Sequence, residues 1–332
     1  MIQLGVIGTN WISHQFVEAA IATGDYQLAG VYSRKLATAT TFAEKYGTAK
    51  TATTFEDFFA LPIDTIYIAS PNSLHFQQAK AAILAKKNVI VEKPAFSTIA
   101  EMEEIIQLAN QENVFFFEAA RNIHEASYQK IAEVICDKGQ VIGGNFSYMK
   151  YSSRYDQVLA GEEPNIFSPH FSGGAIMDLG VYLVYAALGW FGKPQNGYYF
   201  AQKIATGVDG LGFGVLRYQD FDIALQTGKI GDAFLPSEIY FENGTLRLNG
   251  VNAIEEASYY DRLTNQEEII AVQAEENPMI EEARNFAQVI LNPEDQVWGQ
   301  KYEEWVELAR NVNETLYILR SNAEISFDAD KN

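Results

Sequence analysis

The sequence predicts an α/β protein in two parts: a doubly wound parallel sheet, followed by an α+β domain with a large, mainly antiparallel open sheet. Short apolar strands alternate with amphipathic helices from residue 1 to about 118, whereas residues 196–272 contain several strands with no helix between them. The length of 332 residues also exceeds what one hydrophobic core usually serves. We therefore expect two domains, at residues 1–120 and 121–332.

The first part reads as repeated β-α-β units. The strands are expected at residues 4–8, 28–32, 64–70, 89–92 and 114–118. Apolar residues recur at helical spacing between them, for example over residues 74–86 and 98–111. In a sheet of this kind, ligands bind outside the carboxyl ends of the strands, so the residues that follow each strand are the candidates for a site.

The second part has a different pattern. A helix is expected at 124–138 and a strand at 141–151, and Asn243-Gly244 indicates a two-residue hairpin between strands at 237–242 and 245–248. Helices at about 278–291 and 300–321 end the chain. Large apolar side chains are expected on the open face of the sheet, where they would form an interface between subunits: Tyr198, Phe200, Phe213, Tyr218 and Tyr240.

Composition excludes several classes of protein. The net charge of −19 disfavours nucleic acid and anionic membranes as partners. A single cysteine, Cys136, which we expect in or near the core, excludes an internal disulfide framework, and the four histidines show no paired ligand spacing, so we expect no metal site. The chain enters a strand at once, without a signal peptide, and no run approaches the roughly 18 apolar residues of a membrane span. These features predict a cytoplasmic protein.

The first strand-to-helix turn is Gly8-Thr9-Asn10-Trp11-Ile12-Ser13, in the position of a G-x-G-x-x-G dinucleotide fingerprint. Only the first glycine is present. Asn10 tolerates a left-handed backbone and Ser13 is small enough for close helix packing, so the turn still suits a dinucleotide, whose phosphates bind the N-terminus of a helix.

The second expected strand ends in Ser33-Arg34-Lys35, with no acid before Glu44. An acid at this point commonly accepts hydrogen bonds from the ribose 2′-hydroxyl of NAD, whereas two cations and a hydroxyl suit the 2′-phosphate of NADP. We expect NADP(H) to be preferred over NAD(H). A solvated basic loop is the alternative interpretation.

Two further strand ends carry polar residues. The first is the run Ser70-Pro71-Asn72, with His75 close behind, where His75 is either a crevice residue or a helix residue bonded to a main-chain carbonyl. The second is Glu92-Lys93-Pro94, where proline stops a β-branched strand and leaves Lys93 at its end. A plain ion pair pointing into water is the alternative for Glu92 and Lys93.

Asp178 and Tyr182 are four residues apart in a segment with helical periodicity, which places both on one helix face. Gly173 and Gly174 precede them and would allow the helix to approach a ligand closely. Alternatively, Asp178 is a first-turn acid favoured by the helix dipole, and Tyr182 is a core aromatic residue.

Together these motifs resemble the Gfo/Idh/MocA family of NAD(P)-dependent oxidoreductases, along nearly the whole chain. Tyr182, where many members carry histidine, and the run from Phe117 to Arg121 are similar to the dihydrodiol dehydrogenase and glucose–fructose oxidoreductase branch. The resemblance implies a Rossmann domain and a homodimer or dimer of dimers joined through the second sheet. It also implies that Arg121 and Tyr151 line the pocket, with a structural salt bridge or core packing as the alternative for both. His170 is a further candidate to touch the substrate.

The expected reaction is hydride transfer between the nicotinamide and a secondary alcohol or carbonyl of a sugar, polyol or trans-dihydrodiol. A free phenol and a free amine both titrate near pH 10, and an ammonium about 4 Å from a phenol would favour phenolate by up to ~4 kcal/mol. We therefore expect Tyr182 to relay the proton, Lys93 to polarise the reacting oxygen and Asp178 to orient Lys93 or a substrate hydroxyl. Two alternatives remain open: a non-catalytic dinucleotide-sensing regulator, and an enzyme that recycles a tightly bound cofactor.

Overall fold

The computed structural model describes residues 1–47 and 49–331, and the chain divides into two compact units. The first unit contains residues 1–121 and 277–310, and the second contains residues 122–276 and the chain from 311 onward. The chain passes from the first unit to the second after residue 121, and the sequence predicts a domain boundary after residue 120. The second stretch, 277–310, was expected in the C-terminal domain, but its apolar side chains pack on the N-terminal sheet.

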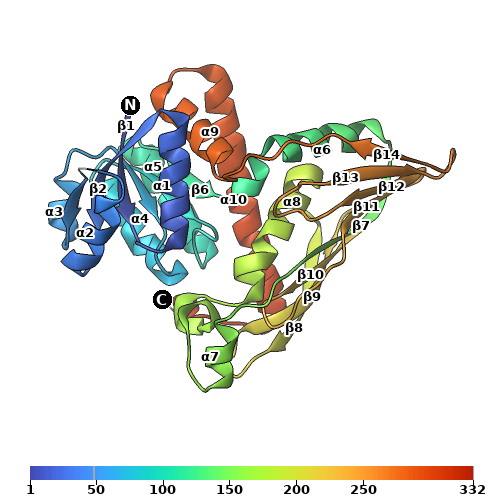
Figure 1. Ribbon diagram of the computed structural model, residues 1–332. Coiled ribbons are helices and arrows are strands. Elements are labelled where there is room, and N and C mark those ends of the chain that lie inside the picture. Colours follow the sequence, from blue (N-terminus) through green and yellow to red (C-terminus); the bar gives the residue numbers. More distant parts are fainter. Residues whose placement is uncertain (48, 332) are drawn as a thin grey trace. The chain divides into compact units, whose positions relative to one another are not determined.

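The first unit is a six-stranded, wholly parallel sheet (Figure 1). Its strands, in the order β3-β2-β1-β4-β5-β6, are β1 (Ile2–Ile7), β2 (Tyr26–Tyr32), β3 (Lys50–Ala52), β4 (Thr65–Ile68), β5 (Asn88–Glu92) and β6 (Phe116–Ala119). This order is that of a Rossmann fold and confirms the doubly wound prediction. Only β3 was not expected, because three residues are too few to show a pattern.

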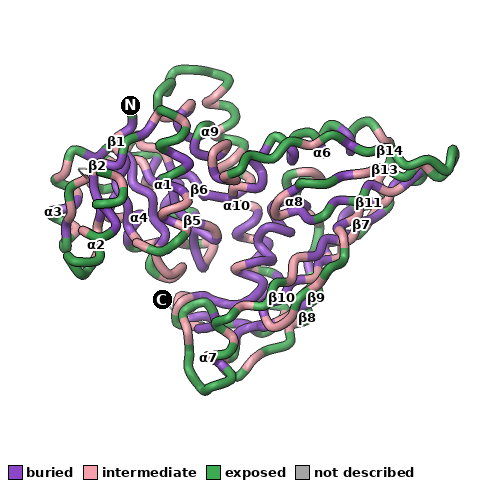
Figure 2. The backbone as a smooth tube through the Cα atoms, viewed as in Figure 1, coloured by how far each residue is buried: buried purple, intermediate pink, exposed green. Residues whose placement is uncertain are grey.

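Helices cover both faces of this sheet. They are α1 (Trp11–Thr23), α2 (Leu36–Glu44), α3 (Phe55–Phe59), α4 (His75–Leu84), α5 (Ile99–Glu112), α9 (Ile280–Leu291) and the first part of α10 (Gln296–Asn322). The strands β1, β4 and β5 are buried along almost their whole length (Figure 2). Burial on both sides explains why they read as continuous apolar runs rather than as alternating ones.

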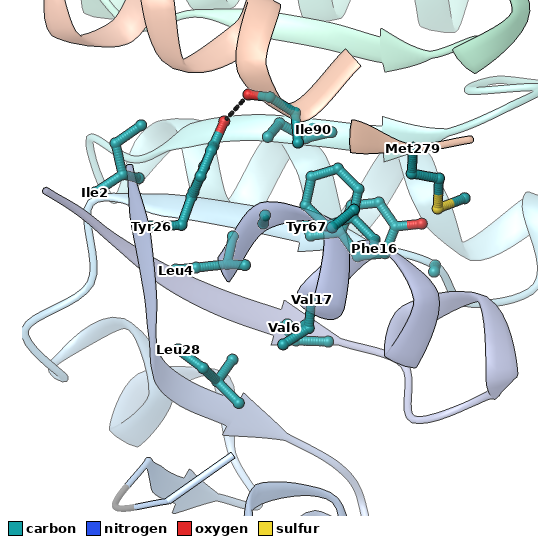
Figure 3. Close-up of a cluster of buried hydrophobic side chains, with 14 of the residues drawn as sticks. Ile2, Leu4, Val6, Phe16, Val17, Tyr26, Leu28, Tyr67, Ile90 and Met279 are labelled. Atoms are coloured by element: carbon teal, nitrogen blue, oxygen red, sulfur yellow. Dashed lines mark hydrogen bonds between the residues drawn. The ribbon is translucent and has the colours of Figure 1, made fainter. Parts of the chain in front are cut away.

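One apolar cluster shows why α9 belongs to the first unit. Phe16 of α1 stacks on Tyr67 of β4, with ring centroids 3.9 Å apart, and Met279 lies close to them (Figure 3). The Tyr26 hydroxyl donates a hydrogen bond of 2.9 Å to the carbonyl of Ala283 in α9. A helix that contributes to the core of a sheet folds with that sheet, whatever its place in the sequence.

The second unit is built on an eight-stranded sheet in the order β14-β13-β12-β11-β7-β10-β9-β8. The strands are β7 (Val141–Met149), β8 (Asn196–Lys203), β9 (Asp209–Arg217), β10 (Asp222–Gly228), β11 (Ser237–Phe241), β12 (Gly244–Leu248), β13 (Ala257–Asp261) and β14 (Gln266–Ile270). Only the β7–β10 pair is parallel, so the sheet is mainly antiparallel as predicted.

Helices lie against one face of this sheet (Figure 1). They are α6 (Ala126–Asp137), α7 (Tyr155–Leu159), the short turns η3 (Asn165–Phe167) and η4 (Pro169–Phe171), the π-helical η5 (Ile176–Gly180), α8 (Val181–Phe191), the end of α10 and the turn η6 (Asp328–Lys331). The stretch Pro169–Phe191 has the length and hydropathy of a membrane span, but 83% of its apolar window is buried within the protein, as in a core helix.

Three details differ from the sequence prediction. The hairpin turn is Glu242-Asn243 and Gly244 already lies in β12, where a Cβ would come within 2.3 Å of the Tyr260 carbonyl oxygen. Tyr218, which directly follows β9, is buried on the helix-covered face and donates to the Ala187 carbonyl at 3.2 Å, because it continues the alternation of that strand. Cys136 is exposed rather than in the core.

Candidate active site

The carboxyl edge of the first sheet brings several predicted residues to one side of the unit. Because its strands are parallel, the residues that follow β1, β2, β4, β5 and β6 all lie at this edge. They are Gly8 to Ile12, Ser33 to Lys35, Ser70 to Asn72, Glu92 with Lys93, and Arg121. Ligands of such sheets bind outside this edge, and the residues that the sequence predicts for the cofactor follow its strands.

The turn after β1 approaches the end of β4 very closely. Gly8 has a φ of +103°, and a Cβ there would lie 2.5 Å from the Ala69 carbonyl oxygen, so only glycine fits. The Asn10 side chain donates to the same carbonyl at 2.7 Å and accepts the N–H of Ile12 at 3.0 Å. Asn10 is thus the N-cap of α1 with an extended backbone, and the left-handed conformation that asparagine tolerates is not used here. Ser13 is fully buried beneath the turn, as its small size predicted.

This turn suits the phosphates of a dinucleotide. It opens a helix of 13 residues that has no acidic residue in its first turn, so the positive end of the helix dipole is not neutralised there. The neighbouring segment after β2 adds two exposed cations, Arg34 and Lys35, while Ser33 is half-buried. The Ser33 hydroxyl accepts the N–H of Lys35 at 3.4 Å.

His75 serves the framework of the edge. Its exposed fraction is 1%, and its two ring nitrogens lie 3.1 Å from the Ala95 carbonyl oxygen and 2.8 Å from the Ser70 carbonyl oxygen. Burial lowers the pKa of His75. The ring joins the segment after β4 to the segment after β5, which is the structural alternative weighed for this residue.

Glu92 also has a structural partner. The Tyr67 hydroxyl donates to its carboxylate at 2.5 Å inside the unit. Burial raises the pKa of Glu92, against the opposing effects of Lys93, the Tyr67 hydrogen bond and Arg121. The next residue, Lys93, is half-buried at the strand end, and the Lys93-Pro94 peptide is cis. The main-chain N–H of Ala95 donates to Glu118 at 3.0 Å, so the turn that presents Lys93 is held from β6.

Asp178 and Tyr182 lie on successive turns within the second unit. Asp178 is in the π-helical turn η5 and is half-buried, while Tyr182 is in the first turn of α8 and is buried. π-Helical turns are rare and are often found at functional sites. The Tyr182 ring meets the Tyr148 ring edge to face, with centroids 5.9 Å apart.

The glycines before this helix have a structural function. A Cβ on Gly173 would lie 2.6 Å from the Ile166 carbonyl, and one on Gly174 would lie 2.2 Å from the Asp209 carboxylate. Asp209 accepts the Ile176 N–H at 2.7 Å and the Tyr199 hydroxyl at 2.6 Å. The pair of glycines therefore lets the helix start pack on the end of the sheet. Close approach to a ligand, the reason expected for these glycines, is not required to explain them.

Two residues expected near the substrate have other partners. His170 forms an ion pair with Asp328 of η6 and lies 3.9 Å from Glu163. The hydrogen bond to Asp328 raises the pKa of His170. Tyr151 is exposed, and its hydroxyl donates to Asp156 at 2.7 Å, which raises the pKa of the phenol.

Sequence reasoning missed two residues beside Asp178 and Tyr182. Tyr148 lies on β7, and Lys229 directly follows β10 and forms an ion pair with Asp178. Lys229 directly follows a strand, as Lys93 does, and this position in the sequence is the signal that could have identified it.

Comparison with known proteins places the chain in a family. Residues 2–120 match GFO_IDH_MocA, the oxidoreductase family with an NAD-binding Rossmann fold. The chain is 39% identical over 291 residues to the uncharacterized oxidoreductase YgjR of Escherichia coli, covering 87% of this chain and 88% of that protein. It is 34% identical over 339 residues to scyllo-inositol 2-dehydrogenase (NADP(+)) IolU of Bacillus subtilis, covering 100% of both proteins.

A more distant relative agrees with this assignment, and a solved structure shares the fold. Trans-1,2-dihydrobenzene-1,2-diol dehydrogenase of Danio rerio is 26% identical over 254 residues, or 74% of each chain. KijD10, a 3-ketoreductase from Actinomadura kijaniata solved with NADP and TDP-benzene, shares the fold with a TM-score of 0.83 over 97% of each chain, at 20% identity. The strand order, the edge residues and these matches lead to one conclusion: the chain belongs to the Gfo/Idh/MocA family and is an oxidoreductase with an NAD(P)-binding Rossmann domain.

Proposed function

We propose that the protein is an NADP(H)-dependent oxidoreductase that interconverts a secondary alcohol and a carbonyl on a sugar, polyol or trans-dihydrodiol. The observation that carries the proposal is the match over the entire length of both chains to an enzyme named as an NADP-dependent inositol dehydrogenase. Because the match includes the second unit, it extends beyond the nucleotide-binding part to the residues that would meet the substrate.

The proposed proton chemistry uses Lys93, Tyr182 and Asp178. When bound, the cofactor accepts or supplies the hydride at its nicotinamide ring. In alcohol oxidation, Tyr182 takes the hydroxyl proton while Lys93 polarises the reacting oxygen and shares that proton. Asp178 binds a neighbouring substrate hydroxyl. The positions of the residues support these roles: Lys93 follows a buried strand, and Asp178 and Tyr182 lie on adjacent turns of one helical segment.

The preference for NADP(H) is proposed from the segment Ser33-Arg34-Lys35. Its two cations are exposed at the end of β2, where the ribose phosphate of NADP would lie in a Rossmann fold. With net charge −19 the protein otherwise repels a phosphorylated ligand, so a local positive segment is needed. The cofactor named for IolU and the one bound to KijD10 are both NADP.

We also propose a cytoplasmic homodimer or dimer of dimers that assembles through the second sheet. The side chains that project from the face opposite the helices include Tyr198, Phe200 and Phe213, all exposed. Phe200 pairs directly with Phe213 in the β8–β9 register, which concentrates apolar surface at one place. Contiguous exposed apolar patches usually mark interaction surfaces.

The test is a dehydrogenase assay over a panel of sugars, inositols and diols, with NADP and NAD measured side by side. We expect turnover of at least one polyhydroxylated substrate and a higher kcat/KM with NADP. Replacement Arg34→Ala should weaken NADP binding and leave NAD binding nearly unchanged, and equal loss for both cofactors would contradict the preference. Nucleotide binding without turnover on any substrate would favour a dinucleotide sensor. Nucleotide that copurifies with the protein would indicate a recycled, tightly bound cofactor.

A further inference from the structure

Lys229 is a buried cation that the proton chemistry above does not use. Its exposed fraction is 3%, and its ammonium group forms an ion pair with Asp178, whose side chain is 36% exposed. An ammonium group removed from water costs several kcal/mol unless it is well paired, so a lysine in this position requires a reason.

The backbone holds Lys229 in place on both sides. Its N–H donates to the Gly210 carbonyl at 2.7 Å, and its carbonyl accepts the N–H of Ser152 at 2.9 Å. The side chain continues the inward alternation of β10, where Ile223, Leu225 and Thr227 are buried. Its ammonium lies 5.4 Å from the centre of the buried Phe167 ring, so an apolar wall keeps water from one side of the pair.

The same corner of the sheet also holds the helix that carries Asp178. Asp209, at the start of β9, accepts the Ile176 N–H at 2.7 Å, and the Thr227 hydroxyl lies 3.4 Å from the Ala175 carbonyl oxygen. The main chain around η5 is thus fixed by β9 and β10, and Lys229 fixes the one charged side chain that η5 presents. The start of β9 and the end of β10 together orient both the helix and its carboxylate.

We propose that Lys229 is a positioning residue for the reaction: it holds the Asp178 carboxylate in the orientation in which it receives a substrate hydroxyl. The inference rests on the proposed function, since it gives Asp178 a substrate to orient. It also limits what Asp178 does. A carboxylate already paired with a buried ammonium acts as a hydrogen-bond acceptor for substrate, while proton transfer stays with Lys93 and Tyr182.

The experiment is a double-mutant cycle on kcat/KM with the Lys229→Met, Asp178→Asn and double variants. We expect Lys229→Met to lower kcat/KM by about 10–100-fold, because a misplaced orienting group costs about that much, with the NADP dissociation constant unchanged. Its separate effects on kcat and KM should match those of Asp178→Asn. In the Asp178→Asn background, Lys229→Met should lower kcat/KM by less than about a further threefold, since the group that Lys229 orients is already lost.

Two further variants separate positioning from support of the fold. Lys229→Arg keeps the charge and should retain more activity than Lys229→Met. Lys193→Met removes an exposed lysine that pairs with Glu314 in the same unit, and it should leave kcat/KM unchanged. If Lys229→Met does not fold, the double variant still supplies a reference, because replacing both partners of a buried pair is less costly than breaking the pair.

The proposal would be overturned if Lys229→Met lowered kcat/KM by the same factor in the wild type and in the Asp178→Asn variant. Wild-type kinetics in Lys229→Met would also overturn it. A stability measurement distinguishes failure of this proposal from failure of the proposed function. If wild-type protein turns over no polyol, the proposed function fails, whereas the same cycle measured on the unfolding midpoint still tests the ion pair. Coupling in stability without coupling in kcat/KM in an active enzyme would make Lys229 a purely structural residue.

Discussion

Lys93 and Tyr182 are individually ordinary residues whose proposed roles come from where the chain presents them. Lys93 follows a buried strand that ends at Pro94, and Tyr182 is a buried phenol beside Tyr148. Each position also has a structural explanation, an ion pair for Lys93 and core packing for Tyr182. Their functional assignment therefore has to be tested by substitutions that preserve shape.

We expect Lys93→Met and Tyr182→Phe each to lower kcat by about 10²–10⁴-fold, the usual contribution of a positioned proton-transfer group. NADP binding, measured by fluorescence titration, should change little, because neither substitution touches the segment Ser33-Arg34-Lys35. Full activity in Tyr182→Phe would transfer the proton relay to Lys93 alone.

At the scale of elements, the important feature is how the helix start at residues 173–176 packs on the end of β9. Gly174 has a φ of +119°, and its missing side chain leaves room for the buried carboxylate of Asp209. Burial raises the pKa of Asp209, while hydrogen bonds from Tyr199 and the Ile176 main chain oppose that effect. The start of β9 thus accepts a main-chain hydrogen bond from the helix start through Asp209. Any side chain at residue 174 must disturb this contact.

Gly174→Ala should therefore destabilise the protein by about 2–5 kcal/mol, from backbone strain and overpacking together. Chemical denaturation monitored by circular dichroism would measure this. Gly299→Ala is the matched control, because that glycine lies in α10 with no atom within 4 Å of its missing Cβ and should be neutral or slightly stabilising. A Gly174→Ala variant as stable as the control would show that the packing here is looser than the structure indicates.

The contact between η4 and η6 should make stability depend on pH. Asp328 raises the pKa of His170, by its hydrogen bond first and by its charge second, and Glu163 adds to this while Lys331 opposes it. A histidine whose pKa is raised on folding contributes stability that is complete below about pH 6.5 and is lost as the pH rises through the folded value.

Wild-type protein should accordingly lose part of its thermal stability above about pH 6.5, relative to His170→Gln. The measurement is the unfolding midpoint of both proteins between about pH 5 and pH 9, and Asp328→Asn should remove the same part of the dependence. The effect is expected to be small, since both side chains are largely exposed. Parallel curves for wild type and variant would rule out this linkage.

At the scale of the whole molecule, the open face of the second sheet is the feature that implies assembly. Phe200 is 71% exposed and Phe213 is 51% exposed, and the two are register partners on neighbouring strands. Leaving both in water is unfavourable by about 25 cal/mol for each Å² of apolar surface, which a second copy of the chain would recover.

Light scattering of the wild-type protein at micromolar concentration should give twice or four times the chain mass. The double substitution Phe200→Glu and Phe213→Glu should shift it toward a single chain, because like charges would then face each other across the interface. Leu159→Glu is the control, since Leu159 is exposed on α7, outside the strands that carry Phe200 and Phe213. A monomeric wild-type protein would refute the proposed assembly.

Much of this architecture could be read from local patterns. Short apolar runs located five of the six strands of the first sheet, the breaks at Pro71 and Pro94 located two of its strand ends, and strands without helices between them predicted the antiparallel sheet. These signals succeed because side-chain periodicity and turn chemistry are properties of a few consecutive residues. The same signals located the edge that carries Gly8, Arg34 and Lys93.

What the sequence by itself determined was therefore the fold class, the family, the strand ends and the types of residue available at them. Only the tertiary structure decided which distant residues meet: Tyr26 with Ala283, Asp209 with Ile176, and Lys229 with Asp178, 51 residues apart. It also decided that residues 277–310 join the first unit and that Tyr218 faces the helices. The physical reason is that pairing across a fold depends on how whole strands and helices pack, and no short stretch of sequence carries that information.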